Sequence, residues 1–119
     1  MSFEASVRYT DDIAILDLAG RIVLNDGSAT MREAIAKLRQ AGSTKILLNL
    51  AGVSFMDSSG LGELASAFSA THKAGGQLKL VNIPARIMDL LRITKLDSIL
   101  TSFPSEPAAL ASFNGAAGA

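Results

Sequence analysis

A short and nearly continuous apolar run at residues 46–50 is the feature that most constrains the fold. A run of this length is typical of a strand buried on both faces of a parallel sheet, and it is too short to span a bilayer. Parallel strands need crossover helices, and apolar residues recur at helical spacing on both sides of the run. These two stripes are Met31, Ile35 and Leu38 before the run, and Leu61, Leu64, Ala65 and Phe68 after it. The sequence therefore predicts an α/β fold with residues 46–50 as a central strand.

The rest of the chain supplies the other elements of such a fold. Alternating residues over 3–9, a turn at Asp11 and Asp12, and a strand over 13–18 closed by Gly20 predict an antiparallel hairpin. Further strands are expected over 78–81 and 98–103, and further helices from Pro84 and over 106–113. We predict a mixed, mainly parallel sheet with an antiparallel N-terminal edge hairpin and about four helices. Residues 1–113 then form one domain, and residues 114–119 a flexible tail.

Composition excludes several classes of function. The chain has 119 residues, 11 basic and 11 acidic, so no net charge attracts nucleic acid or an anionic membrane. It has no Cys, which excludes thiol nucleophiles and Cys-ligated metals. The N-terminus lacks the apolar core of a secretory signal, and no run is long enough to cross a membrane. We expect a cytoplasmic protein that needs no metal or cofactor.

Residues 53–62 carry the chemical information. An apolar strand, a short loop and then Asp57, Ser58 and Ser59 at a helix start place two hydroxyls over unpaired backbone N–H groups. Such a site favours an anion, and a phosphate on Ser58 would gain from the helix dipole. Asp57 could equally be a simple N-cap, because Asp and Ser are common at helix starts.

Two glycines follow, and each costs about 1 kcal/mol relative to Ala inside a helix. Gly60 and Gly62 either let another surface approach the helix closely or permit tight packing of the helix on the sheet. Leu61, between them, could reach the core or a partner. The residues alone leave both interpretations open.

The segment Phe-Met-Asp-Ser-Ser-Gly-Leu-Gly at 55–62 resembles the signature of STAS domains, specifically of single-domain bacterial anti-sigma factor antagonists. The resemblance extends over residues 3–113. It implies that Ser58 is phosphorylated by an anti-sigma factor that is also a serine kinase of the GHKL class. The unmodified protein would bind this kinase, and a metal-dependent Ser/Thr phosphatase would reset it. The chain would then be a substrate and a ligand, not an enzyme.

Site residues follow from this resemblance. Asp57, Ser59, Gly60 and Gly62 are expected to support phosphorylation of Ser58. A partner is expected to contact Leu61, Arg21 and Asp26.

The loop after the hairpin departs from the family pattern. Residues 20–23 read Gly-Arg-Ile-Val where many members carry an acidic segment, and Asp26 comes later. Partner contacts can differ for this reason. The alternative function is a constitutive STAS subunit or scaffold of a transport or signalling complex, without a phosphorylation switch.

Four other chemistries fit less well. Residues 60–65 match the glycine pattern of dinucleotide sites, but the expected strand ends near Leu50 and the next strand ends without an acidic residue. A phosphoacceptor role for Asp57 needs an acidic pair after a buried strand, and Asp11 and Asp12 suit a turn better. The one histidine, His72, lies about 20 Å along the helix from Ser58, too far for a hydrolase dyad. Asp57 and Glu63 are six residues apart, so on a helix they point to different faces and make a poor acid/base pair.

Overall fold

The computed structural model describes residues 3–118, with side chains through residue 113. Over this range one sheet has the strand order β1-β2-β3-β4-β5, with β1 antiparallel to β2 and the other pairs parallel. The strands are β1 (Glu4–Thr10), β2 (Ile13–Ile22), β3 (Lys45–Met56), β4 (Gln77–Val81) and β5 (Ser102–Phe103). The helices are α1 (Gly27–Gln40), α2 (Ser58–Lys73), α3 (Ala85–Ile93) and α4 (Glu106–Gly118), with a 3₁₀ turn at Leu96–Ser98. The predicted fold class and the central position of residues 46–50 are confirmed.

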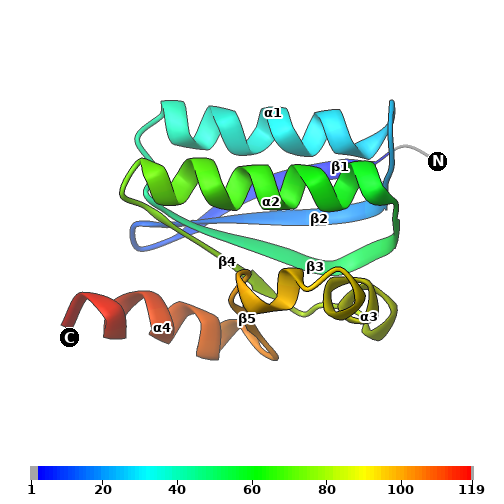
Figure 1. Cartoon of the computed structure of the whole chain (residues 1–119). Helices are drawn as coiled ribbons and strands as arrows, with labels where there is room; N and C mark the ends of the chain where they lie inside the picture. Colours follow the sequence, from blue (N-terminus) through cyan, green and yellow to red (C-terminus); the bar gives the residue numbers. More distant parts are fainter. Residues whose placement is uncertain (1–2, 119) are drawn as a thin grey trace.

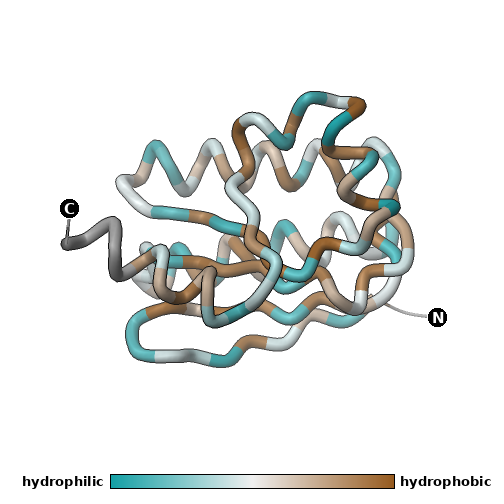
Figure 2. Tube along the Cα trace, turned by 90° about the horizontal axis from the view of Figure 1, so that it is seen from below, coloured by the Kyte–Doolittle hydropathy of each residue, from teal (hydrophilic) through white to brown (hydrophobic). Residues whose placement is uncertain are grey.

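Helices α1 and α2 lie side by side on one face of the sheet (Figure 1). Their apolar stripes pack on alternate strand residues, because successive side chains of a strand point to opposite faces. Leu16, Leu48 and Leu80 meet Met31 and Leu64 in this main core, and all five are fully buried. The hydrophobic stretches of the chain run along the middle strands (Figure 2). This layer fixes where α1 and α2 begin relative to the sheet.

A smaller core lies on the opposite face, beneath α4. It consists of Ile13, Ile15, Leu47, Val81, Ala109 and Phe113. The central strands are therefore apolar on both faces, which explains the continuous run at 46–50. The helix α4 runs to Gly118, past the expected end at residue 113, and whether residues 114–119 are flexible stays a prediction.

The N-terminal hairpin forms as predicted, with Thr10 opposite Ile13 across the turn. However, β2 continues through Gly20 to Ile22, so the expected strand end at Gly20 is wrong. Gly20 has a φ of 107°, and the register with β3 shifts between Gly20 and Arg21. Because only glycine adopts such a φ without strain, Gly20 lets β2 continue past this register shift, at which β3 carries the extra residue Ser54.

Strand β3 continues to Met56, so its expected end at Leu50 is also wrong. Beyond Asn49 it pairs with β2 alone, and only Leu50, Val53 and Met56 of that half are buried. This half of β3 is buried on one face only, so its sequence is not a continuous apolar run, and the prediction relied on such a run. The position of the strand end therefore does not argue against a dinucleotide site. The lack of an acidic residue at the end of β4, where Asn82 follows Val81, still does.

Two further boundaries differ from expectation. The strand expected over 98–103 is only Ser102–Phe103, because the backbone N–H of Leu100 bonds to the carbonyl of Leu96 in a turn. This turn buries Leu100 in the main core. Pro84 is the N-cap of α3 and not its first helical residue.

Candidate functional site

The turn from β3 into α2 is organised by the side chain of Asp57. One carboxylate oxygen, Oδ1, accepts a hydrogen bond from the backbone N–H of Gly60 at 3.0 Å, which is the expected N-cap. The other, Oδ2, accepts from the backbone N–H of Leu24 at 3.1 Å. These two bonds, the one from Gly60 first, hold the pKa of Asp57 below its ordinary value. Both carboxylate oxygens therefore face backbone donors.

Ser58 is the first residue of α2, and it is exposed. The turn before it is held to β2, because the backbone N–H of Asp57 donates to the carbonyl of Ile22 at 3.3 Å. The first N–H groups of an α-helix have no partner within the helix, and the helix dipole places partial positive charge there. The structure thus presents the Ser58 hydroxyl to solvent at a helix end that favours an anion.

Ser59 links the starts of two helices. Its hydroxyl lies 3.0 Å from the hydroxyl of Ser28, which is 3% exposed in the first turn of α1. This hydrogen bond of Ser59 reaches across to α1 and does not lie within the turn that Ser59 begins. The two helices begin at the same end of the sheet (Figure 1). Both N-termini therefore lie close to Ser58.

The two glycines of α2 have different surroundings. A Cβ on Gly60 would lie 2.5 Å from the carbonyl oxygen of Ile22 and 2.6 Å from Cγ of Met56. Gly60 is buried, so it permits tight packing of α2 on the sheet and does not open the surface. A Cβ on Gly62 would meet nothing within 4 Å. Gly62 alone leaves the helix surface open.

The residues expected to contact a partner differ in their exposure. Leu61 is 9% exposed and packs in the main core, so it is a core residue and not a contact for a partner. Arg21 is exposed at the end of β2, with its guanidinium carbon 5.6 Å from the ring centroid of Phe55. Asp26 is half-buried at the N-cap of α1, without a side-chain capping bond.

Two exposed apolar residues belong to the segments that meet at this turn. Leu24, tethered through its backbone to Asp57, has 66% of its surface exposed, and Phe55 has 40% exposed. Sequence reasoning missed Leu24, which follows Val23 in the loop before α1 and is not marked by any local pattern. We call Ser58, Arg21, Leu24 and Phe55 the Ser58 surface.

The other candidate sites lack the necessary groups. His72 is exposed in the last turn of α2 and stacks on Phe68, with 5.9 Å between ring centroids. Glu63 forms an ion pair with Arg32 at 2.8 Å. In the described part of the chain, no three His, Asp or Glu side chains could hold a metal ion, and no helix could cross a membrane.

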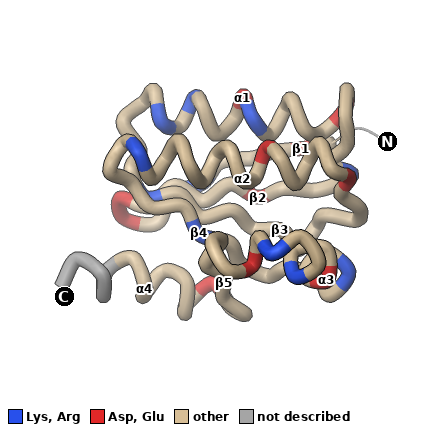
Figure 3. Tube along the Cα trace, viewed as in Figure 1, with Lys and Arg blue, Asp and Glu red and all other residues tan. Residues whose placement is uncertain are grey.

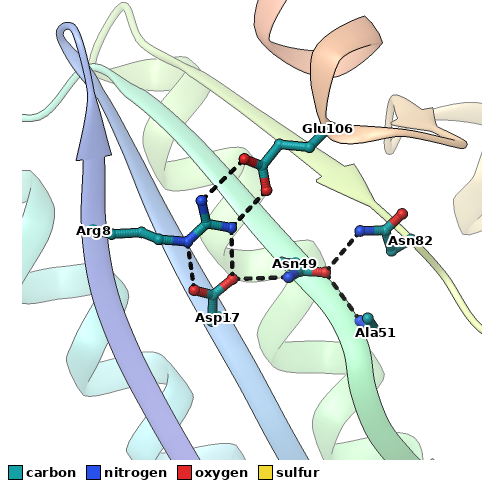
Figure 4. Close-up of polar contacts among 6 residues, drawn as sticks. All are labelled: Arg8, Asp17, Asn49, Ala51, Asn82 and Glu106. Carbon is teal, nitrogen blue, oxygen red and sulfur yellow. Dashed lines mark hydrogen bonds and ion pairs between the residues drawn. The ribbon is translucent and has the colours of Figure 1, made fainter.

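A polar network on the face opposite α1 and α2 was not predicted. Arg8 of β1 bonds to Asp17 of β2 and to Glu106 at the start of α4, as Figure 4 shows. Asp17 also accepts from Asn49, which in turn accepts from Asn82 at 3.2 Å. The hydrogen bonds from Arg8 lower the pKa of Asp17 and the pKa of Glu106. The network ties α4 to the sheet edge, away from Ser58.

Known proteins share this architecture. The family model described as "STAS domain" matches residues 4–109. The chain belongs to the STAS domain family. An anti-sigma-B factor antagonist of Bacillus subtilis (strain 168) is 32% identical over 100 residues, which cover 84% of this chain and 90% of the relative.

Solved structures of similar proteins agree on the fold. An anti-sigma factor antagonist from Mycobacterium paratuberculosis has a TM-score of 0.85 at 21% identity, with 93% of each chain covered. The Bacillus cell fate determinant SpoIIAA, solved in its phosphorylated form, has a TM-score of 0.71 at 20% identity. That comparison covers 92% of this STAS chain and 99% of SpoIIAA. At these identities the likeness establishes the fold.

Proposed function

We propose that this STAS domain is an anti-sigma factor antagonist that switches partners through phosphorylation of Ser58. In the unmodified state it binds an anti-sigma factor that is also a serine kinase of the GHKL class. Phosphorylation releases that partner, and a metal-dependent Ser/Thr phosphatase restores binding. The observation that carries the proposal is the exposed Ser58 at the N-terminus of α2, with an antagonist as a relative at 32% identity. The proposal places the protein in the cytoplasm, where the kinase finds ATP.

Ser58 takes part in the transfer only as the acceptor. Its Oγ forms the new bond to the γ-phosphorus, the bond from that phosphorus to ADP breaks, and ADP leaves. The hydroxyl proton passes to a base. Asp57 is a poor base for this step, because its pKa is lowered and both oxygens accept backbone hydrogen bonds. The kinase therefore supplies the base, and Asp57 positions the acceptor.

Release follows from the chemistry of the Ser58 surface. A phosphate adds a charge of about −1.5 to −2 next to Leu24, whose side chain is 66% exposed. A partner that buries Leu24 must then also desolvate the phosphate. A hundredfold loss of affinity needs only about 2.7 kcal/mol. The helix dipole stabilises the phosphate within the free domain by about 0.3–1 kcal/mol, so the fold tolerates the modification.

The test compares baits with single substitutions in native lysate and with the purified kinase. Wild-type protein and Ser58→Ala should retain a GHKL-type kinase, and Ser58→Asp should not. Ser69→Asp is the matched control, because Ser69 is also exposed on α2 but lies away from its N-terminus. With kinase and ATP, peptide mapping should find phosphate on Ser58 in the wild type and none in Ser58→Ala. Phosphate only at another residue would refute the assignment. Recovery of the same transport or scaffold subunits by all baits would favour the constitutive module instead.

A further inference from the structure

Strand β1 leaves one edge of the sheet open. It pairs with β2 in an unbroken register from Glu4 to Thr10, and no strand of the described chain pairs with its other edge. Natural edge strands are usually short, bulged, or protected by Lys or Pro. β1 has seven residues, no Lys or Pro and no bulge against β2, and its Arg8 is bonded to Asp17 and Glu106, while Val7 and Tyr9 expose 46% and 58% of their surface. The edge is therefore able to accept a further strand.

A groove runs beside this edge, between β1 and α1. It has a volume of about 350 Å³, and it is lined by Ala5, Val7, Thr30, Glu33, Ala34 and Lys37, among others. Glu33 and Lys37 stand one turn apart on α1 and are both exposed. Within the described chain neither of them forms an ion pair. The surface thus offers both signs of charge beside an apolar strip.

We propose that the occupant of this edge is a second copy of the same chain, bound antiparallel about a two-fold axis through Val7. A two-fold interface repeats each contact, so a surface must be complementary to itself. With the axis at Val7, the exposed Tyr9 of one copy covers the small Ala5 of the other. On the α1 layer, Glu33 of each copy faces Lys37 of its partner. The two sheets join into one across the axis.

The opposite face of β1 selects this register. The hydrogen bonds of Arg8 to Asp17 and Glu106 use four of the five guanidinium N–H groups, which leaves one on Nη1. With the axis at Val7, Ser6 of the second copy lies opposite Arg8, and its hydroxyl can accept that N–H. Moving the axis to Ser6 would instead place Glu4 of the second copy opposite Arg8, which already binds Asp17 and Glu106, so that three carboxylates would share one guanidinium. The chain has no net charge, so two copies meet no long-range repulsion.

Sedimentation equilibrium of the purified full chain tests the proposal. We expect a concentration-dependent dimer with a Kd on the order of micromolar, as befits a small interface. Val7→Lys, at an exposed site, should weaken it at least about tenfold and leave the far-UV circular dichroism unchanged. A chain that stays monomeric to about 1 mM, or a dimer that survives Val7→Lys, would overturn the proposal.

Charge substitutions on α1 test the two-fold arrangement itself. Lys37→Glu alone and Glu33→Lys alone should each weaken the dimer by about fivefold, because like charges then face each other. The double variant restores opposite charges across the axis and should recover wild-type affinity. Lys73→Glu, an exposed substitution at the end of α2, is the control and should change nothing. Failure of the double variant to recover affinity would refute the two-fold arrangement.

Discussion

The carboxylate of Asp57 holds the backbone N–H of Leu24, with 3.1 Å between Oδ2 and N, although the residues are 33 positions apart. The other carboxylate oxygen caps α2 at the same time. One side chain thus sets both the start of α2 and the loop between β2 and α1. The exposed Leu24 stands beside Ser58 for this reason, and the proposed contact surface depends on it.

Substitutions of Asp57 should separate these two roles. Asp57→Asn keeps an oxygen that can cap Gly60, but its amide nitrogen cannot accept the N–H of Leu24. Asp57→Ala loses both bonds. We expect the urea midpoint to decrease from wild type to Asp57→Asn to Asp57→Ala. In Asp57→Asn, hydrogen exchange should be faster at the Leu24 amide but not at the Gly60 amide. Equal exchange at both amides in that variant would show that the tether is not formed in solution.

Gly60 and Gly62 should respond oppositely to the same substitution. Gly60→Ala places a Cβ against the Ile22 carbonyl oxygen and should destabilise the fold by about 1–3 kcal/mol. Gly62→Ala meets open space and should stabilise it by up to about 1 kcal/mol through helix propensity. Chemical denaturation of the two variants measures both effects. A destabilising Gly62→Ala would mean that α2 does not have this backbone at Gly62.

The network around Arg8 should make stability depend on acid pH. Asp17 and Glu106 have pKa values below their ordinary values of 3.8 and 4.5, so their contribution is present above about pH 4.5. This contribution is lost as the pH falls through the lowered pKa values. The unfolded state binds protons at a higher pH than the folded state, so acid favours unfolding. Arg8→Met should be less stable than wild type by about 1 kcal/mol at pH 7, since the network is partly exposed.

The difference between wild type and Arg8→Met should shrink as the pH is lowered from 7 towards 2, as measured by urea denaturation at each pH. Arg92→Met removes the exposed ion pair with Asp89 and serves as the control, with little effect at any pH. A difference for Arg8→Met that persists unchanged at pH 2 would show that packing of its side chain, and not its charge, stabilises α4.

Thr71 should be more stable as valine. Its side chain is 1% exposed, and its hydroxyl has no hydrogen-bond partner among the described residues. Replacing an unpaired buried hydroxyl by a methyl group of similar shape should raise the free energy of unfolding by about 1 kcal/mol. Thr94→Val is the control, because the Thr94 hydroxyl donates to the carbonyl of Leu90 at 2.7 Å, and it should lose stability. A loss of stability in Thr71→Val as well would indicate that an internal water satisfies the hydroxyl.

Hydrophobic spacing predicted the type of an element correctly where the spacing depends on that element alone. The helical stripes of α1 and α2 and the alternation in β1 led to the correct element types, since burial of one face imposes the period. Boundaries failed where pairing with a neighbour decided them. The pattern predicts a strand end at Gly20, but pairing with β3 keeps β2 extended to Ile22, past a register shift. The same pairing carries β3 on to Met56.

For the candidate site, too, features that depend on neighbouring residues were predicted, and features that depend on packing between elements were not. Asp57 as the cap of α2 and Ser58 at the helix N-terminus followed from the order of the residues, because capping depends only on neighbours within one turn. The role of Gly60 and the burial of Leu61 did not, since both depend on how α2 sits on the end of β2. Leu24 and Ser28 were missed because they reach the site through α1 and its loop.

The pairing of charged residues could not be predicted from the sequence. Composition and local spacing sufficed to establish that the chain is neutral, forms an α/β fold and has a serine at a helix start. Figure 3 shows basic and acidic residues interspersed along α1, α2 and α3. Only the tertiary structure decided which of them meet, such as Arg8 with Glu106 across 98 positions. Contacts between distant segments depend on the packing of the whole chain, which no local pattern encodes.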